Sequence, residues 1–465
     1  MSFVSAPQEK FAAVFDRSPY QTTDPIVKIQ HVQKGNNVVF GRTIQDDNYD
    51  KLIYIGKVLE NTMGKNYLSA DIWLDLTFPH VTYVTGTRGS GKSFDLGVLI
   101  EGISKLINPS PIQQCIEPIC SIVIDTQSQF WTLKYPPNPK VKENAIQLEQ
   151  LKRWNIKPNA LANCRLLIPP NVEKITGDEE VFHIKPDQVR HEEWCALIDE
   201  DVYSPQGHVL AQTIEKIPEK DYSIDHMISY IQNDSNWHNV PEVSRNAVVY
   251  KLNGYRRTGL FSNQGLQISS LLKQGQCTVF LLREIRNVDK SLITGIVARQ
   301  ISKIMGEHQK RMKVSAFFEK TTATEELPNQ VWLLIDEAHV IAPSGSVSPA
   351  KEALIDYVKR GRDAGLSLVM ATQQPSAIDD KILSQVNLSF SHRLTFQSDI
   401  NAAMNRIPTK LLGSVKFKGL EVTDFGDMLR NLEAGECFIG DHNTSRVILS
   451  SIRPRVTSHG GYSPS

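Results

Sequence analysis

The sequence predicts an α/β fold in which a mainly parallel sheet is covered by helices on both faces. From His80 onward, short and nearly continuous apolar runs recur, with helical stretches between several of them. Such runs are typical of strands that are buried on both faces of a sheet. The chain has 465 residues, of which 40% are hydrophobic, so it is large enough for a substantial core. The six runs are HVTYVTG, CSIVIDT, CRLLIP, CTVFLLREI, VWLLIDEA and LSLVMATQQ.

Two of the intervening helices have clear signals. One is an apolar stripe with spacings of three and four, which predicts a helix that packs on the sheet; its residues are Leu292, Ile293, Ile296, Val297, Ile301, Ile304 and Met305. The other, SPAKEALIDYVKRGRDAG, starts with Ser-Pro and closes on Gly365, a residue typical of a helix C-cap.

The pattern along the chain predicts the domain organisation. Short strand-like runs (IVKIQHV, NNVVFG, KLIYIGKVL) precede the core and predict a small β-rich module. A polar, mostly helical segment with an acidic first part interrupts the core. The last runs, GECFIGDH and SRVILSSIRPR, predict an antiparallel pair at the sheet edge, and the Gly, Ser and Pro that follow predict a flexible tail. The predicted parts are an N-terminal segment 1–24, the β module 25–79, the core 80–170 and 276–455, the insertion 171–275 and the tail 456–465.

Composition excludes several classes of protein. The 51 basic and 51 acidic residues balance, so any contact with nucleic acid must come from a local patch or from the pore of an oligomer. The six cysteines fall singly, without zinc spacing. The sequence has neither a leader pattern nor an apolar run of 18 residues, so we expect a cytoplasmic protein without a membrane span.

The strongest chemical motif is GTRGSGKS, which follows the strand run VTYVT and precedes a helical pattern. Backbone N–H groups of such a glycine loop bind phosphate oxygens, and the helix N-terminus adds positive potential. We expect Lys92 to reach the β and γ phosphates of ATP, and Ser93 to bind magnesium. The predicted nucleotide-binding residues are Gly86, Thr87, Arg88, Gly89, Ser90, Gly91, Lys92, Ser93 and Phe94.

A second motif, VWLLIDEAH, ends an apolar strand in two carboxylates. We expect Asp336 to hold magnesium and Glu337 to polarise the attacking water. Alone, such a pair also fits a solvated turn or a helix cap.

Polar residues end two further strand runs. Gln373 would contact the γ-phosphate and the water if its strand lies between the two motif strands. Asp125, which closes CSIVIDT, fits either the nucleotide edge or a cap.

Basic residues give weaker signals. Arg362, and second to it Arg360, near a helix end, fit either an exposed charge or an arginine finger inserted into a neighbouring subunit. The histidines His80, His339 and His392 show no ligand spacing. Two groups of mainly basic residues are candidates for DNA contact or for solvated surface. The two groups are Arg245, Lys251, Arg256 and Arg257 with Tyr255, and Lys410, Lys416 and Lys418.

The order GTRGSGKS, VWLLIDEAH and YVKRGRDAGLSLVMATQQPSAIDDKILSQVN resembles the HerA ATPases of the HerA/FtsK group. The third block is the most specific, and the likeness extends over about residues 65–455. Residues 25–79 take the place of the small N-terminal β-barrel of that group, so the resemblance implies a barrel-like module there. It implies a RecA-like core of the additional-strand kind, with Lys92 and Ser93 in the phosphate loop, Asp336 and Glu337 as the acidic pair, and Gln373 as sensor. It also implies Arg362 as the finger in trans.

The resemblance further implies a hexameric ring with ATP sites between subunits and a channel for double-stranded DNA. Partners in this group are a nuclease or a sirtuin-like effector, in DNA end resection or in anti-phage defence. Gln374 departs from the group, which often carries Arg there. Three functions are therefore compared: a DNA translocase or helicase, an ATPase scaffold that regulates an effector, and a kinase or transferase. The last leaves Arg362 and the block TQQPS unexplained.

Overall fold

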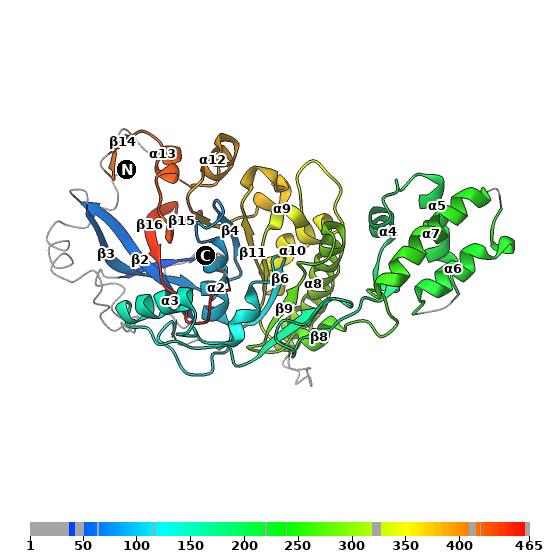
Figure 1. The fold of residues 1–465 in the computed structure, drawn as a ribbon, viewed down its shortest axis with the longest axis horizontal. Coiled ribbons are helices and arrows are strands. Elements are labelled where there is room, and N and C mark those ends of the chain that lie inside the picture. The colour runs from blue at the N-terminus through cyan, green and yellow to red at the C-terminus, as the bar shows by residue number, and fades with distance from the viewer. Residues whose placement is uncertain are drawn as a thin grey trace.

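The computed structural model describes residues 37–41, 51–62, 65–114, 117–218, 221–238, 240–318, 327–408, 415–418 and 420–460. In these ranges a sheet of fourteen strands runs in the order β1-β3-β2-β16-β15-β12-β4-β11-β10-β6-β9-β7-β8, with β5 paired to β2 (Figure 1). Its strands are β1 (Asn37–Phe40), β2 (Leu52–Thr62), β3 (Lys65–Asp75), β4 (Val81–Thr85), β5 (Gln113–Gln114), β6 (Cys120–Asp125), β7 (Cys164–Ile168), β8 (Glu180–Val181), β9 (Cys277–Leu281), β10 (Val331–Ile335), β11 (Leu366–Thr372), β12 (Leu388–Ser391), β15 (Glu436–Asp441) and β16 (Arg446–Ile452). A separate hairpin pairs β13 (Val415–Phe417) with β14 (Leu420–Val422).

The helices connect and cover these strands. They are α2 (Lys92–Ile103), α3 (Lys142–Arg153), α4 (His191–Leu197), α5 (Pro205–Lys216), α6 (Ile224–Gln232), α7 (Glu242–Thr258), α8 (Asn287–Phe317), α9 (Ala338–Ile341), α10 (Lys351–Ala364), α11 (Asp380–Leu383), α12 (Gln397–Met404) and α13 (Phe425–Arg430). Short 3-10 turns are η2 (Phe130–Lys134), η3 (Pro186–Gln188), η4 (Asp234–Asn236), η5 (Ile268–Leu271) and η6 (Pro375–Ala377). Although α8 has 31 residues, none of the helices in the described ranges is long and apolar enough to cross a membrane.

The centre of the sheet is parallel, as the sequence predicts. From β12 through β4, β11, β10, β6, β9 and β7 to β8, each neighbouring pair is parallel. The α/β fold class is therefore confirmed.

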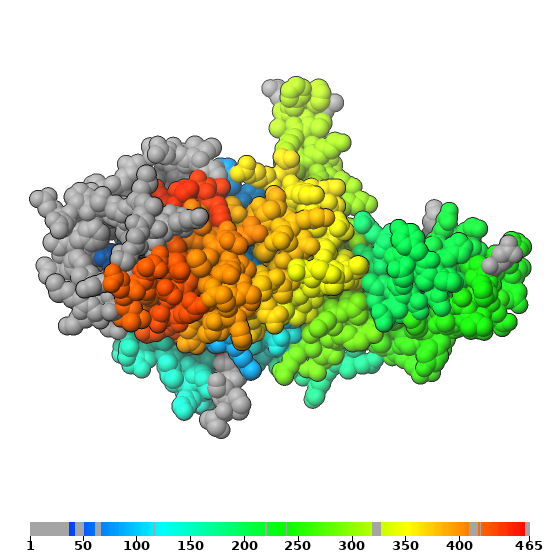
Figure 2. All heavy atoms as spheres, turned by 90° about the horizontal axis from the view of Figure 1, so that it is seen from above, coloured from blue at the N-terminus to red at the C-terminus, as the bar shows by residue number. Residues whose placement is uncertain are grey.

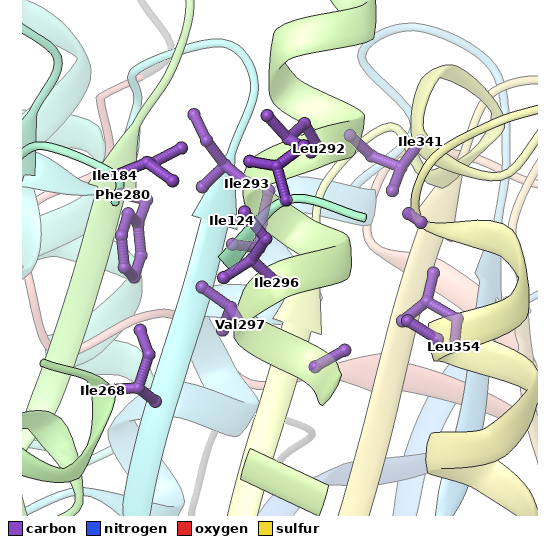
Figure 3. Close-up of a cluster of buried hydrophobic side chains, with 14 of the residues drawn as sticks. Ile124, Ile184, Ile268, Phe280, Leu292, Ile293, Ile296, Val297, Ile341 and Leu354 are labelled. Carbon is purple, nitrogen blue, oxygen red and sulfur yellow. The ribbon is translucent and has the colours of Figure 1, made fainter. Parts of the chain in front are cut away.

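Both faces of the sheet are buried. Along β10, Leu333 and Ile335 point into one hydrophobic cluster, and Trp332 and Leu334 into the other. The first cluster includes α8 and α10, and the second includes α2 and α3. Figure 3 shows Leu292, Ile293, Ile296 and Val297 of the predicted stripe of α8 against the sheet, and the rest of the stripe belongs to the same cluster. This alternation explains why the strands are apolar throughout.

The helices α4 to α7 form a lobe at one end of the molecule, as Figures 1 and 2 both show. Within the predicted insertion, the described residues from α4 to α7 are mainly helical, whereas residues 180–181 form strand β8 of the sheet. The chain leaves the sheet and returns to it at adjacent points: the N–H of Ile184 donates to Leu260 O, and the N–H of Ser262 donates to Ile184 O.

The edges of the sheet differ from the prediction. Within the described residues, β1, β2 and β3 extend the central sheet, because β16 pairs with β2 on one side and β15 on the other. The antiparallel pair β15–β16 is confirmed, but it lies inside the sheet. The predicted run IVKIQHV lies outside the described residues.

The start of the predicted flexible tail is also different, because it belongs to the core. Glu101, on α2, is fully buried. Its carboxylate accepts hydrogen bonds from Arg453 Nη1 at 2.8 Å, Arg455 Nε at 3.4 Å, and the backbone N–H groups of Val456 and Thr457 at 3.0 and 2.9 Å. These charged contacts, which composition does not reveal, fix the segment on α2.

We expect Glu101→Gln to lower the free energy of unfolding by about 3 to 5 kcal/mol, because removing one partner of a buried ion pair leaves uncompensated charge. The measurement is chemical denaturation monitored by circular dichroism. The control is Glu149→Gln, whose carboxylate forms an exposed pair with Arg153, and we expect a change below about 1 kcal/mol there. Equal effects of the two variants would contradict the assigned role of Glu101.

Candidate functional site

The sheet brings the predicted motifs to one edge. β11 lies between β4 and β10 and is parallel to both, with Thr372 opposite Thr85 and Met370 opposite Ile335. The carboxyl ends of the three strands therefore meet, and they carry the glycine loop, Gln373 and the acidic pair. This satisfies the condition on which the assignment of Gln373 depended.

The glycine loop has a conformation and packing that require glycine. Gly91 has φ +128°, and a Cβ on Gly86 would lie 2.3 Å from Ser90 Oγ and 2.7 Å from His392 Cβ. The N–H of Thr87 donates to Arg393 O at 2.8 Å, and the N–H of Gly435 to Ser90 O at 3.3 Å. The loop is thus anchored by segments that follow β12 and precede β15.

Lys92 begins α2 and lies over the loop. Its Nζ donates to Thr87 O at 2.8 Å, and the side chain is nearly buried. Burial lowers the pKa of Lys92, against the opposing effect of the carboxylates of Glu337, Asp336 and Asp95. The lysine therefore interacts electrostatically with the acidic pair.

Asp336 is a fully buried carboxylate, and neither of its oxygens has a hydrogen-bond partner among the described residues. Burial, and next the charge of Glu337, raises its pKa well above the usual value. An uncompensated carboxylate is costly unless a cation binds it. Oxygen ligands are those that magnesium prefers, so the donor set of Asp336 and the Ser93 hydroxyl fits this ion.

Glu337 is held in a defined position beside Asp336. Its backbone is left-handed, with φ 51°, which turns the chain out of β10. Its carboxylate accepts hydrogen bonds from the backbone N–H of Gln373 at 3.3 Å and from the side-chain amide of Gln373. His339 Nδ1 lies 3.4 Å from the same carboxylate and 3.1 Å from Thr372 Oγ1. Strained conformations of this kind occur at functional sites.

Asp125 acts as a cap. Its carboxylate accepts the N–H groups of Phe130 at 2.7 Å and Gln127 at 3.1 Å, so it orders the turn before η2. Burial raises its pKa to about 6, against the lowering effect of these hydrogen bonds. Of the two interpretations that the sequence left open, the structure favours the cap.

Arg360 and Arg362 do not join the site of their own chain. They are exposed in the last two turns of α10, which leads into the start of β11. The glycine loop lies at the opposite end of that strand. Either arginine can reach a nucleotide only on another copy of the chain.

Most of the described basic candidates for DNA contact have other partners. Arg245 is buried and pairs with Asp234 at 2.7 Å, and Lys251 donates to Ile198 O at 2.7 Å. The remaining pairs are Tyr255 with Asp289, Arg256 with Asp225, and Lys418 with Glu433 and Glu436, whereas Arg257 is exposed. Arg245, Lys251, Tyr255 and Lys418 therefore have partners within the protein that the sequence did not reveal. Lys410 and the side chain of Lys416 lie outside what the structure describes.

His392 takes part in the site although its sequence context gave no signal. Its Nε2 lies 2.7 Å from Asp95 Oδ2, and its Nδ1 lies 2.9 Å from Glu436 O. Donor atoms of Asp95, His392 and Cys437 all lie within 4.8 Å of one another. The direct hydrogen bond between His392 and Asp95 joins β12 to α2 beneath the glycine loop. His80, in contrast, is buried against Asp75 O just before β4, at the end of that strand opposite the glycine loop.

Comparisons with known proteins give a consistent result. A model of the family described as "Helicase HerA, central domain" matches residues 53–301. The DNA double-strand break repair helicase HerA of Pyrococcus furiosus is 30% identical over 69 residues, which are 15% of this chain and 12% of that protein. The chain therefore matches only a small part of the length of this curated relative.

Solved structures with a similar arrangement share little sequence. VirB4 of Thermoanaerobacter pseudethanolicus has a TM-score of 0.49 at 13% identity, over 88% of this chain and 98% of that one. The unbound conjugative coupling protein TrwB has a TM-score of 0.48 at 12% identity, over 83% and 87%. The family match, in contrast, spans more than half of the chain and includes the glycine loop, and the chain therefore belongs to the family of the HerA helicase central domain.

Proposed function

We propose that the chain binds ATP with magnesium and hydrolyses the bond between the β- and γ-phosphates. The observation that carries this proposal is the meeting of Lys92, Asp336 and Glu337 at one edge of the sheet. A lysine over a glycine loop, a buried carboxylate without a partner and a positioned second carboxylate match the needs of a polyanionic substrate and its cation. Asp336 and Ser93 would hold magnesium, which neutralises phosphate charge when it is bound.

Each residue then has a defined task. The N–H groups of the loop bind phosphate oxygens, and Lys92 exchanges Thr87 O for the β and γ phosphates. Glu337 orients the attacking water and draws on its proton. Gln373 contacts both Glu337 and the γ-phosphate, so that it links arrival of the substrate to the position of Glu337.

We further propose that the ATPase is a ring-forming motor on double-stranded DNA, most simply a hexamer, with Arg362 completing the site of the neighbouring subunit. Membership of the HerA family supports this, as does the exposure of Arg362 at the opposite edge of the sheet. The name of the Pyrococcus furiosus relative supports DNA as the substrate. A partner nuclease or sirtuin-like effector, in anti-phage defence, is part of the same proposal.

One observation favours a second candidate, an ATPase scaffold that regulates an effector without translocation. Arg245, Lys251 and Lys418 are occupied by acidic or carbonyl partners, so they do not form a basic surface. The net charge of zero points in the same direction.

Steady-state ATP hydrolysis with and without linear duplex DNA separates the two candidates. We expect the DNA to stimulate hydrolysis, and the stimulation to fall as salt rises from about 50 to 200 mM, because phosphate contacts are salt-dependent. Glu337→Gln serves as the blank. A rate that is clear but indifferent to DNA would support the scaffold, and a rate equal to the blank would contradict the ATPase itself.

A further inference from the structure

Two aromatic rings from distant parts of the sequence meet beside the first turn of α2. Phe94 directly follows Ser93, and His459 comes from the C-terminal segment. Their ring centroids lie 5.6 Å apart with an interplanar angle of 71°, an edge-to-face contact. Both residues are partly exposed.

The C-terminal segment runs along α2 toward the glycine loop. Arg453 Nη2 donates to Val98 O at 3.0 Å, and Arg455 covers Gly97, where a Cβ would lie 2.4 Å from its Nε. Four residues after Arg455, His459 reaches Phe94. The contacts move from Val98 to Gly97 to Phe94 as the residue numbers of the segment rise, so its described part reaches the N-terminus of α2, beside the loop that would hold phosphates.

Helix α3 fixes the same segment from the other side. Gln147 Nε2 donates to Arg455 O and to Thr457 O, both at 2.7 Å, and Gln147 Oε1 accepts the N–H of His459 at 3.3 Å. The hydroxyl of Ser458 donates a hydrogen bond to Asn144 Oδ1 at 2.8 Å. His459 is therefore placed by a rigid support.

The contacts of His459 also define its chemical form. Arg455 Nη1 lies 3.3 Å from His459 Nδ1, and a guanidinium can only donate, so Nδ1 accepts and Nε2 carries the hydrogen. Burial, and next the charge of Arg455, lowers the pKa of His459 to about 3. At neutral pH the ring is uncharged and offers one N–H donor.

We propose that Phe94 and His459 form the binding site for the purine base of the nucleotide, with the base against the two rings and the Nε2–H of His459 donating to a ring nitrogen. The proposal rests on the proposed ATP binding. A nucleotide whose phosphates lie on the loop and Ser93 must place its nucleoside outside the first turn of α2. Neutral aromatic rings suit a flat, uncharged heterocycle, and base–aromatic stacking is worth about 1 to 3 kcal/mol, which corresponds to about a 5- to 150-fold change in affinity.

The test compares the wild type, His459→Ala and His459→Phe in ATP hydrolysis, with magnesium tripolyphosphate as a competitive inhibitor that has phosphates but no base. We expect His459→Ala to raise KM for ATP at least about fivefold with kcat within about twofold. The inhibition constant of tripolyphosphate should stay unchanged. His459→Phe, which keeps a ring, should recover part of the loss in KM. The matched control is His208→Ala, on the exposed side of α5, which should behave as the wild type.

The outcomes separate this inference from the proposed function. An unchanged KM in His459→Ala, with active wild type, would overturn the base site and leave the ATPase standing. A parallel rise in KM and in the inhibition constant of tripolyphosphate would also overturn it, because His459 would then act by shaping α2 and the loop. Wild-type protein that neither hydrolyses ATP nor binds tripolyphosphate would contradict the proposed function itself.

Discussion

Glu337→Gln should lower kcat for ATP hydrolysis by about 10² to 10⁴, the range that a positioned general base contributes, while ATP still binds. The substitution keeps the size of the side chain and removes the charge that orients water. Binding should persist because Lys92, the loop and Asp336 are unchanged. The measurements are single-turnover release of phosphate and titration with a fluorescent ATP analogue.

Two controls give this result its meaning. Glu352→Gln changes an exposed carboxylate in the first turn of α10 and should leave kcat unchanged. Lys92→Ala should lose nucleotide binding itself, because it removes the cation over the loop. If Glu337→Gln turned ATP over at the wild-type rate, the assignment of the acidic pair would be wrong.

Arg362→Ala should lower kcat by about 10³ to 10⁵, the effect of losing an arginine finger, and should leave nucleotide binding largely intact. The structure makes this a prediction about two subunits, since Arg362 lies at the amino-terminal edge of β11 and Gln373 follows the other end of that strand. Lys359→Ala, on the same helix and also exposed, is the matched control for loss of surface charge. Arg360→Ala measures the second choice.

Mixing variants tests the arrangement in trans directly. A subunit with Glu337→Gln still carries Arg362, and a subunit with Arg362→Ala still carries Glu337. Where a Glu337→Gln subunit supplies its Arg362 to the site of an Arg362→Ala subunit, that site contains both Glu337 and Arg362. Co-assembled variants should therefore be more active than either variant alone. If Arg362→Ala hydrolyses ATP at the normal rate, this arginine belongs to the solvated surface.

The parts of the site that are local in sequence could be predicted. The glycine loop with Lys92 comes directly after one apolar strand run, and the pair Asp336 and Glu337 directly after another. The sequence therefore gave both the residue types and their position at the end of a strand. The role of Gln373 depended on strand order, which sequence alone left as a condition. The neighbours of β11 meet that condition.

The parts that arise from long-range packing could not be predicted. Asp95 and His392 are 297 residues apart and touch only because β12 lies next to β4. The start of the C-terminal tail was predicted to be flexible from its Gly, Ser and Pro content. That composition does not show that the buried Glu101 binds the backbone of Val456 and Thr457. Similarly, the sequence around Arg245 does not show whether its side chain is solvated or forms an ion pair with Asp234.

The adjacent ends of the helical lobe have a practical consequence. Because Ile184 is hydrogen-bonded to Leu260 and Ser262, the distance that the lobe must span is fixed and short whatever its length. The closure cost of such a segment grows only slowly with the number of residues. A foreign domain that replaces the lobe would therefore have to span only this short distance between its ends. It would also have to supply a carboxylate for the partly buried Arg299 of α8, which Glu193 of α4 now pairs, and to cover the apolar residues of α8 on which the lobe packs.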